Sequence, residues 1–216
     1  MGITIIKVVS FDLHETLVTP AFVGAVWYEG IPHIYAERRR LTFEKAKEEV
    51  LKAYASVNED SREYFDLNFW SERLDLGGYQ AAVDFCKHRV AYYPETFDVL
   101  ARLKQKYPLI IATSMPREFM PPIMAPIEHF FTRVFSSYSD YTQFKCTDFY
   151  LTVCREMGIK PAEMLHVGDN WTKDYEMPKS VGINAIHLDR KGKPGDCVIT
   201  DLTQLEEKLK VISNYS

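Results

Sequence analysis

The feature that most constrains this chain is an almost continuous apolar run near its start, residues 3–10, which is rich in β-branched side chains. Such a run predicts a strand that is buried on both faces, as strands of parallel sheets are. Asp12 follows directly where this strand should end. Because ligands of open parallel sheets bind outside the carboxyl ends of the strands, Asp12 is a candidate for chemistry.

Further apolar segments downstream have the length and composition of buried strands, and helical patterns lie between them. The predicted strands are residues 108–112, 133–136, 163–167, 184–188 and a short 197–199. The predicted helices that separate or follow them are residues 96–106, 147–157, 171–181 and 202–211. Strands that alternate with helices predict an α/β fold with a parallel sheet and right-handed crossovers.

The block between the first two strands, from about residue 19 to residue 92, contains no convincing strand. Helical patterns occupy residues 42–54, 62–74 and 79–90, and Thr42 is a suitable N-cap. We therefore expect a small helical unit inserted after the first strand. The basic run Arg38-Arg39-Arg40 within it is better explained as a solvated helix end, favoured by the helix dipole, than as a clamp for an anionic substrate.

The composition is that of an ordinary globular protein and argues against several classes of function. The chain has 216 residues, 46% of them apolar, with a net charge of -4 that gives no attraction to nucleic acid or anionic membranes. No leader pattern or spanning apolar run is visible, and the four cysteines form no CxxC pair and are expected to be reduced thiols. We expect a cytoplasmic protein, a monomer or homodimer, without nucleic-acid or membrane partners.

Polar side chains follow the predicted strands closely. Asp12, Thr113 and Asp169 each come one or two residues after a buried strand, and Lys145 follows the third strand after a longer loop. Because the carboxyl ends of parallel strands share one edge, we expect these four side chains to converge. Two carboxylates with a backbone carbonyl and waters suit Mg²⁺, a lysine and a hydroxyl suit phosphate oxygens, and an aspartate can attack phosphorus.

These residues belong to four segments through which the chain resembles the haloacid dehalogenase-like (HAD) hydrolase superfamily. The segments are residues 11–17 (FDLHETL, usually containing DxDGT), residues 110–114 (IIATS), Lys145 and residues 166–174 (HVGDNWTKD, containing GDxxxxD). Their order and spacing agree with the family over nearly the whole chain, and the fourth is the most specific. The resemblance implies a Rossmann-like core, residues 1–18 and 93–216, and a helical C1 cap of subfamily I, residues 19–92.

The resemblance also implies a nucleophile and a metal site. Asp12 would be the nucleophile. Its carboxylate, the backbone carbonyl of His14 and the side chain of Asp169 would hold Mg²⁺, and Asp174 would support the metal or Lys145. The simpler interpretation of Asp169 and Asp174 is a pair of acids at a helix N-terminus, favoured by the dipole. The accompanying Gly168 and Lys145 argue that this is not their whole role.

The transferred phosphoryl group would be bound by Thr113 and Lys145, according to the same resemblance. Ser114 occupies the neighbouring position and would share this role if the alignment is shifted by one residue. Alone, Thr113 is a strand-end residue that caps the next turn. The other three motifs are what favour a phosphate-binding hydroxyl here.

The first motif departs from the family's pattern at two positions. Family phosphatases usually carry a second aspartate, the general acid and base, where this chain has His14, and glycine where it has Glu15. His14 either replaces that acid–base group or supplies only its carbonyl to the metal. True haloacid dehalogenases also lack the second aspartate and need no metal, but their fourth motif resembles a serine-asparagine version. Both acids persist in this chain, which favours Mg²⁺.

Three functions therefore remain open from the sequence. The first is a Mg²⁺-dependent phosphatase that acts on a small phosphorylated metabolite through an aspartyl-phosphate. The second is a dehalogenase or another carbon-centred hydrolase of the same fold, whose activity would survive chelation. The third is a catalytically weak phosphate-binding or interaction protein, in which His14 and Glu15 mark lost chemistry.

Overall fold

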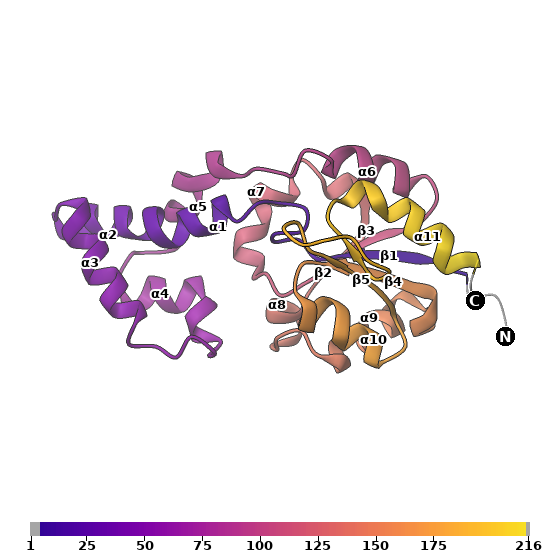
Figure 1. Ribbon diagram of the computed structural model, residues 1–216. Helices are drawn as coiled ribbons and strands as arrows, with labels where there is room; N and C mark the ends of the chain where they lie inside the picture. Colours follow the sequence, from indigo (N-terminus) through magenta and orange to yellow (C-terminus); the bar gives the residue numbers. More distant parts are fainter. Residues whose placement is uncertain (1–4, 215–216) are drawn as a thin grey trace. The chain divides into compact units, whose positions relative to one another are not determined.

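A computed structural model describes residues 5–214 of the chain (Figure 1). Within that range, six strands form one parallel sheet in the order β3-β2-β1-β4-β5-β6, so the predicted α/β fold is confirmed. In chain order the strands are β1 Val8–Phe11, β2 Leu109–Thr113, β3 Phe131–Ser136, β4 Met164–Gly168, β5 Asn184–Leu188 and β6 Val198–Ile199. The first strand lies in the middle of the sheet, between β2 and β4.

The strand β1 is shorter than the apolar run predicted. Residues 3–4 of that run lie outside the described range, and the ladder begins only at Val8. Val8 pairs with Met164, the first residue of β4, and Val9 pairs with Leu109, the first residue of β2. Among the described residues before Val8, the Lys7 N–H donates to the carbonyl of Glu163 at 2.7 Å, but none of residues 5–7 is paired in the sheet. All four residues of β1 are buried, as a central parallel strand requires.

Helices cover both faces of this sheet, as parallel strands need (Figure 1). On one face lie α6 Thr96–Lys104 and α11 Leu205–Asn214, and on the other lie α8 Ser137–Tyr141, α9 Thr147–Met157 and α10 Met177–Ser180. Short 3-10 turns occupy Glu128–Phe130, Pro161–Glu163 and Leu202–Gln204. The predicted helix 171–181 is divided into a π-helical segment, Trp171–Glu176, and α10. Such π-helical segments are rare and frequently lie at functional sites.

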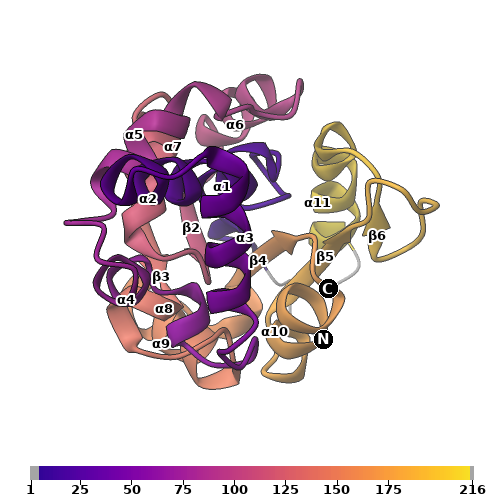
Figure 2. The same ribbon diagram turned by 90° about the vertical axis from the view of Figure 1, so that its left-hand side faces the viewer.

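A second compact unit comprises residues 19–91 and Pro116–Ile123 and is helical. Its elements are α1 Ala21–Ala25, a π-helical Val26–Gly30, α2 Ile31–Arg39, α3 Phe43–Tyr54, α4 Leu67–Arg73, α5 Gln80–Cys86, a 3-10 turn Arg117–Phe119 and most of α7 Met120–Met124, with further 3-10 turns at Glu63–Phe65 and Lys87–Arg89 (Figure 2). Thr42 caps α3 as predicted, by accepting a hydrogen bond from the Lys45 N–H. Arg38 and Arg39 end α2 as exposed ion-pair partners of Asp75, which fits the solvated helix end.

The boundary of this unit differs from the predicted 19–92 at Tyr92, which belongs to the unit that contains the sheet, and at Pro116–Ile123, which the sequence assigned to the core. The Phe119 ring packs edge-on against Phe22 at 6.3 Å between centroids and against Trp27 at 5.7 Å. Val18 and Tyr92 form an antiparallel bridge, so the two ends of the insertion meet. Among the described residues, no helix has the length and apolar composition needed to cross a membrane.

Candidate active site

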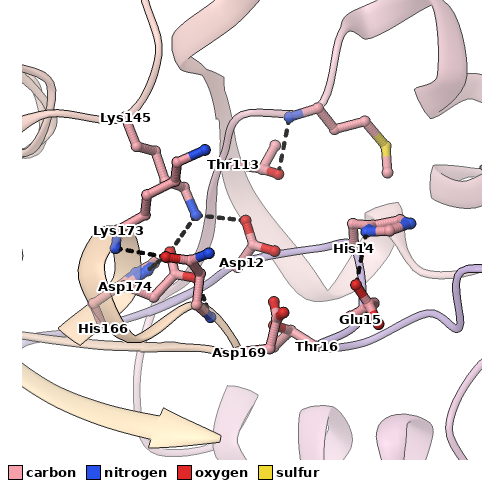
Figure 3. A network of polar contacts seen from close by, with 12 residues as sticks. Asp12, His14, Glu15, Thr16, Thr113, Lys145, His166, Asp169, Lys173 and Asp174 are labelled. Atoms are coloured by element: carbon pink, nitrogen blue, oxygen red, sulfur yellow. Dashed lines mark hydrogen bonds and ion pairs between the residues drawn. The ribbon is translucent and has the colours of Figure 1, made fainter. Parts of the chain in front are cut away.

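Four of the predicted side chains, those of Asp12, Lys145, Asp169 and Asp174, meet at the carboxyl edge of the central strands (Figure 3). Asp12 follows β1 directly, and its N–H donates to the carbonyl of Val167 in β4 at 2.8 Å. Asp169 follows β4 directly, and Lys145 comes from the segment between α8 and α9. Ligand oxygens of Asp12, Asp169 and Asp174 all lie within 4.8 Å of one another. The sheet therefore assembles the carboxylate group that the motifs predicted.

The Lys145 ammonium lies between two of these carboxylates. Its Nζ is 2.5 Å from Oδ1 of Asp12 and 2.5 Å from Oδ1 of Asp174, and its side chain is only 2% exposed. Burial acts to lower the pKa of Lys145, but the charges of Asp12 and Asp174 outweigh it and raise the pKa above its usual value. A fixed positive charge is therefore held directly beside Asp12.

Both carboxylate oxygens of Asp174 are in contact with hydrogen-bond donors. Its Oδ1 receives Lys145 and lies 3.2 Å from Nε2 of His166 and 3.3 Å from the Tyr150 hydroxyl, while its Oδ2 accepts the Asn170 N–H at 3.0 Å. Burial acts to raise the pKa of Asp174, but Lys145 and His166 hold it well below its usual range. This carboxylate is thus an ionised anchor for Lys145.

Gly168, the glycine of the fourth motif, is required by the position of Asp174. A Cβ at Gly168 would lie 2.4 Å from Cγ of Asp174 and 2.5 Å from its Oδ2. Contacts this short do not occur at real Cβ atoms, so a larger residue would displace the carboxylate that holds Lys145. The spacing of the motif therefore has a steric cause.

His166 and Tyr150 support Asp174 and were not predicted. His166 is fully buried in β4, with Nδ1 2.9 Å from the Ser10 hydroxyl and Nε2 3.0 Å from the Tyr150 hydroxyl. Burial lowers the pKa of His166, so its ring is neutral at pH 7 and acts by hydrogen bonding. The sequence signal that would have revealed it is a single polar residue within an apolar strand.

The negative charges of the other two carboxylates, Asp12 and Asp169, are less fully offset by neighbouring groups than the charge of Asp174 is. Burial raises the pKa of Asp12 to about 6, opposed by Lys145 and reinforced by Asp174. Burial also raises the pKa of Asp169 to about 6, reinforced by Asp174 and Glu15. Clustered carboxylates that raise one another's pKa form an oxygen-only donor set, which a hard divalent cation such as Mg²⁺ relieves. These residues fit a magnesium site.

His14 and Glu15 lie on the other side of Asp12 from Lys145 (Figure 3). The His14 side chain is 33% exposed, with Nδ1 3.7 Å from a carboxylate oxygen of Glu15. Its Nε2 is buried and has no hydrogen-bond partner within residues 5–214. The ring is thus not committed to a structural hydrogen bond through that nitrogen.

Thr113 and Ser114 differ in the availability of their hydroxyls. Thr113 is the last residue of β2 rather than the first beyond it, and its Oγ1 accepts the Met115 N–H at 3.2 Å. With this hydrogen bond Thr113 caps the turn that follows β2, which is the simpler of the two roles that the sequence suggested for it. The Ser114 hydroxyl is buried without a hydrogen-bond partner in the described part of the chain. The neighbouring position therefore offers the uncommitted hydroxyl.

Comparisons with known proteins agree with this arrangement. The family model for haloacid dehalogenase-like hydrolases matches residues 6–182. A curated relative, the 5-amino-6-(5-phospho-D-ribitylamino)uracil phosphatase YigB of Escherichia coli (strain K12), is 24% identical over 197 residues, covering 78% of this chain and 77% of its own. A HAD phosphatase from Thermococcus onnurineus has a similar structure, with 25% identity and a TM-score of 0.77 over 94% of this chain and 98% of that one.

A dehalogenase also shares the fold. The 2-haloacid dehalogenase from Pseudomonas syringae pv. Tomato DC3000 superposes with a TM-score of 0.62 at 23% identity, covering 96% of this chain and 99% of that one. Since the family match extends over most of the sequence and the sheet, motifs and acidic cluster agree with it, the chain belongs to the haloacid dehalogenase-like hydrolases.

Proposed function

We propose that this hydrolase is a Mg²⁺-dependent phosphatase, which removes the phosphoryl group from a small phosphorylated metabolite through an aspartyl-phosphate on Asp12. The observation that carries the proposal is the buried ammonium of Lys145, which lies 2.5 Å from both Asp12 and Asp174 beside a third carboxylate, Asp169. A carboxylate nucleophile, a fixed cation and an oxygen-only donor set together suit phosphoryl transfer.

In the first step, one oxygen of Asp12 attacks phosphorus and the bond from phosphorus to the substrate's ester oxygen breaks. The phosphoryl group then resides on Asp12, and the leaving alkoxide departs as the alcohol after it takes a proton from water or from the His14 imidazole. In the second step, water attacks the same phosphorus and gives up a proton, the bond from phosphorus to the Asp12 oxygen breaks, and phosphate and the free carboxylate result. Lys145, next to the attacking Asp12, stabilises the negative charge on the phosphoryl oxygens in both steps.

The metal would be held by Asp12, Asp169 and the backbone carbonyl of His14, and Mg²⁺ bound there would neutralise charge on the phosphoryl oxygens. We assign Asp174 to Lys145 rather than directly to the metal, because both of its oxygens already accept hydrogen bonds. For the second phosphate contact we favour Ser114, whose buried hydroxyl has no hydrogen-bond partner among the described residues, over Thr113, whose Oγ1 already accepts the Met115 N–H.

The proposal is tested by a screen of phosphorylated metabolites with Mg²⁺ and with EDTA. The curated relative is named as a phosphatase of 5-amino-6-(5-phospho-D-ribitylamino)uracil, so that compound belongs in the screen beside sugar phosphates and nucleotides. We expect phosphate release that requires Mg²⁺. Absence of release from every compound, with the protein folded and Mg²⁺ present, would contradict the proposal.

A dehalogenase is the second candidate, favoured by His14 in place of the usual aspartate and by the shared fold of the Pseudomonas enzyme. In that reaction Asp12 would attack carbon and displace halide. Halide release from 2-haloacids, unchanged by EDTA, would support it. We favour the phosphatase because Asp169 and Asp174 retain both acids of the fourth motif.

A further inference from the structure

Arg190 lies two residues beyond β5 and contacts the loop that follows the nucleophile, although no motif assigns it a role. Its Nη2 donates to the carbonyl oxygen of Thr16 at 2.8 Å, and its Nε donates to the carbonyl oxygen of Glu15 at 3.4 Å. One guanidinium group therefore holds two successive peptide carbonyls of the first motif.

The guanidinium is itself fixed in place by two other side chains. Its Nη1 lies 2.7 Å from Oε1 of Glu95, and these side chains are 18% and 9% exposed. The group also lies over the ring of Tyr93, 3.4 Å from the ring centroid. A planar, multidentate donor can make these contacts at once, which a lysine ammonium cannot. Arg190 is thus a preformed clamp.

The loop that Arg190 holds has an unfavourable backbone conformation. Glu15 has a φ of 57°, in the left-handed region that glycine adopts readily and residues with a Cβ disfavour. The next residue, Thr16, is fully buried and its hydroxyl donates to Oδ1 of Asp169 at 3.3 Å. The conformation at Glu15 is therefore coupled directly to the acidic cluster.

We propose that Arg190 is a positioning residue for metal binding, which keeps residues 13–17 in the conformation that presents the His14 carbonyl beside Asp12. This inference rests on the proposed Mg²⁺-dependent function and adds a residue to its site. Without Arg190, the strain at Glu15 is released by movement of the loop. Affinity for Mg²⁺ and kcat then fall, whereas KM for the substrate changes little.

Three variants isolate this role. Arg190→Ala removes the clamp, and Arg190→Lys keeps the charge but loses the multidentate geometry. Arg133→Ala is the matched control, because Arg133 also pairs with a carboxylate at 2.5 Å, donates to a carbonyl and lies over an aromatic ring. Its partners are Glu156 and Phe135, in the same unit as the site.

Amide hydrogen exchange tests the positioning directly and needs neither metal nor substrate. The N–H groups of Leu17 and Val18 both donate to the carbonyl of Leu13, at 3.0 and 3.1 Å, so their exchange reports on the loop. We expect about tenfold faster exchange in Arg190→Ala, a smaller change in Arg190→Lys and none in Arg133→Ala. Unchanged exchange in both Arg190 variants would overturn the proposal.

Isothermal titration with Mg²⁺ tests the consequence. We expect about tenfold weaker binding in Arg190→Ala, and partial recovery when Glu15→Gly is added, because glycine needs no clamp at this φ. Mg²⁺ affinity equal to the parent's would overturn the metal-binding role. If the parent bound no Mg²⁺, the metal-positioning proposal and the proposed function would both fail, and the exchange result would then decide only whether Arg190 orders the loop.

Discussion

At the scale of single residues, the three carboxylates of the site differ in how far neighbouring donors and positive charges offset their negative charge. Asp174 is an ionised anchor with donors on both oxygens, whereas burial raises the pKa of Asp12 and of Asp169 to about 6. The two under-compensated carboxylates are the ones assigned to the metal and to the chemistry. The protein therefore holds them in a state that a cation stabilises.

This difference predicts how Mg²⁺ stabilisation depends on pH. The folded pKa values of Asp12 and Asp169 lie above the ordinary value of 3.8, so ionisation between about pH 4 and 6 destabilises the metal-free fold. Mg²⁺ binds the ionised form, so its increment to Tm should be small at about pH 5 and larger at about pH 7. Thermal unfolding with and without Mg²⁺ measures this. A Tm increment from Mg²⁺ that is equal at both pH values would contradict the assignment of Asp12 and Asp169 to the metal. As a control, Asp169→Asn should abolish the Tm increment.

His14 is tested by comparing two substitutions. If the imidazole gives and takes the protons of the two steps, His14→Ala should lower kcat about a hundredfold or more. His14→Asp should then restore part of the activity with a different pH profile, because a carboxylate titrates at lower pH. Steady-state kinetics across pH provides the comparison. An alanine variant with the parent's activity and profile would leave only the backbone carbonyl of His14 in a functional role.

How far the sequence predicts the site depends on where each partner lies in the chain. Asp12, Lys145 and the acids of the fourth motif were predictable because each follows a recognisable strand or belongs to a spaced motif. Arg190 could not be predicted, because it contacts backbone carbonyls about 175 positions earlier in the chain. Every residue has such a carbonyl, so the sequence does not indicate which ones are bound. His166 and Tyr150 act through a third residue, so spacing alone does not reveal them.

At the scale of secondary structure elements, the end of β4 determines the geometry of the site. Gly168→Ala should displace Asp174 and release Lys145, because the new Cβ would lie 2.4 Å from Cγ of Asp174. We expect a loss of about 1–3 kcal/mol in the free energy of unfolding, measured in urea, and a large loss of activity. Gly24→Ala in α1 is the control, because, apart from its chain neighbours and the backbone of its own helix, no described atom lies within 4 Å of its added Cβ. A Gly168→Ala variant as stable and active as the control would refute this explanation.

The elements themselves were predicted better than their boundaries. The predicted alternation of strands with helices is confirmed, because the buried strands are short apolar runs between turn residues and can be recognised as such. The predicted start of β1 was wrong, because the pairing with β2 and β4, rather than the apolar composition of the segment, determines where the strand begins. The segment Pro116–Ile123 could not be assigned from sequence, because only the contacts of Phe119 show which unit it joins.

At the scale of the whole molecule, the helical insertion should be separable from the sheet. Its ends meet at the bridge between Val18 and Tyr92, so a short glycine-serine linker can replace residues 19–91. Because Phe119 would lose its partners Phe22 and Trp27, the deletion should carry Phe119→Ser. We expect cooperative unfolding and retained Mg²⁺ binding, with loss of preference among substrates. A shortened chain that no longer unfolds cooperatively would show that the sheet depends on the insertion.

The central claim is that Asp12 accepts the phosphoryl group, and rapid acid quenching followed by peptide mass spectrometry tests it most directly. Parent protein with Mg²⁺ and a metabolite hydrolysed in the screen should yield one added phosphoryl group on the peptide that contains Asp12. EDTA or Asp12→Asn should remove both this adduct and turnover, because loss of a covalent nucleophile eliminates the pathway. Phosphate release from Asp12→Asn at the parent's rate, with no adduct on the parent's peptide, would contradict the account.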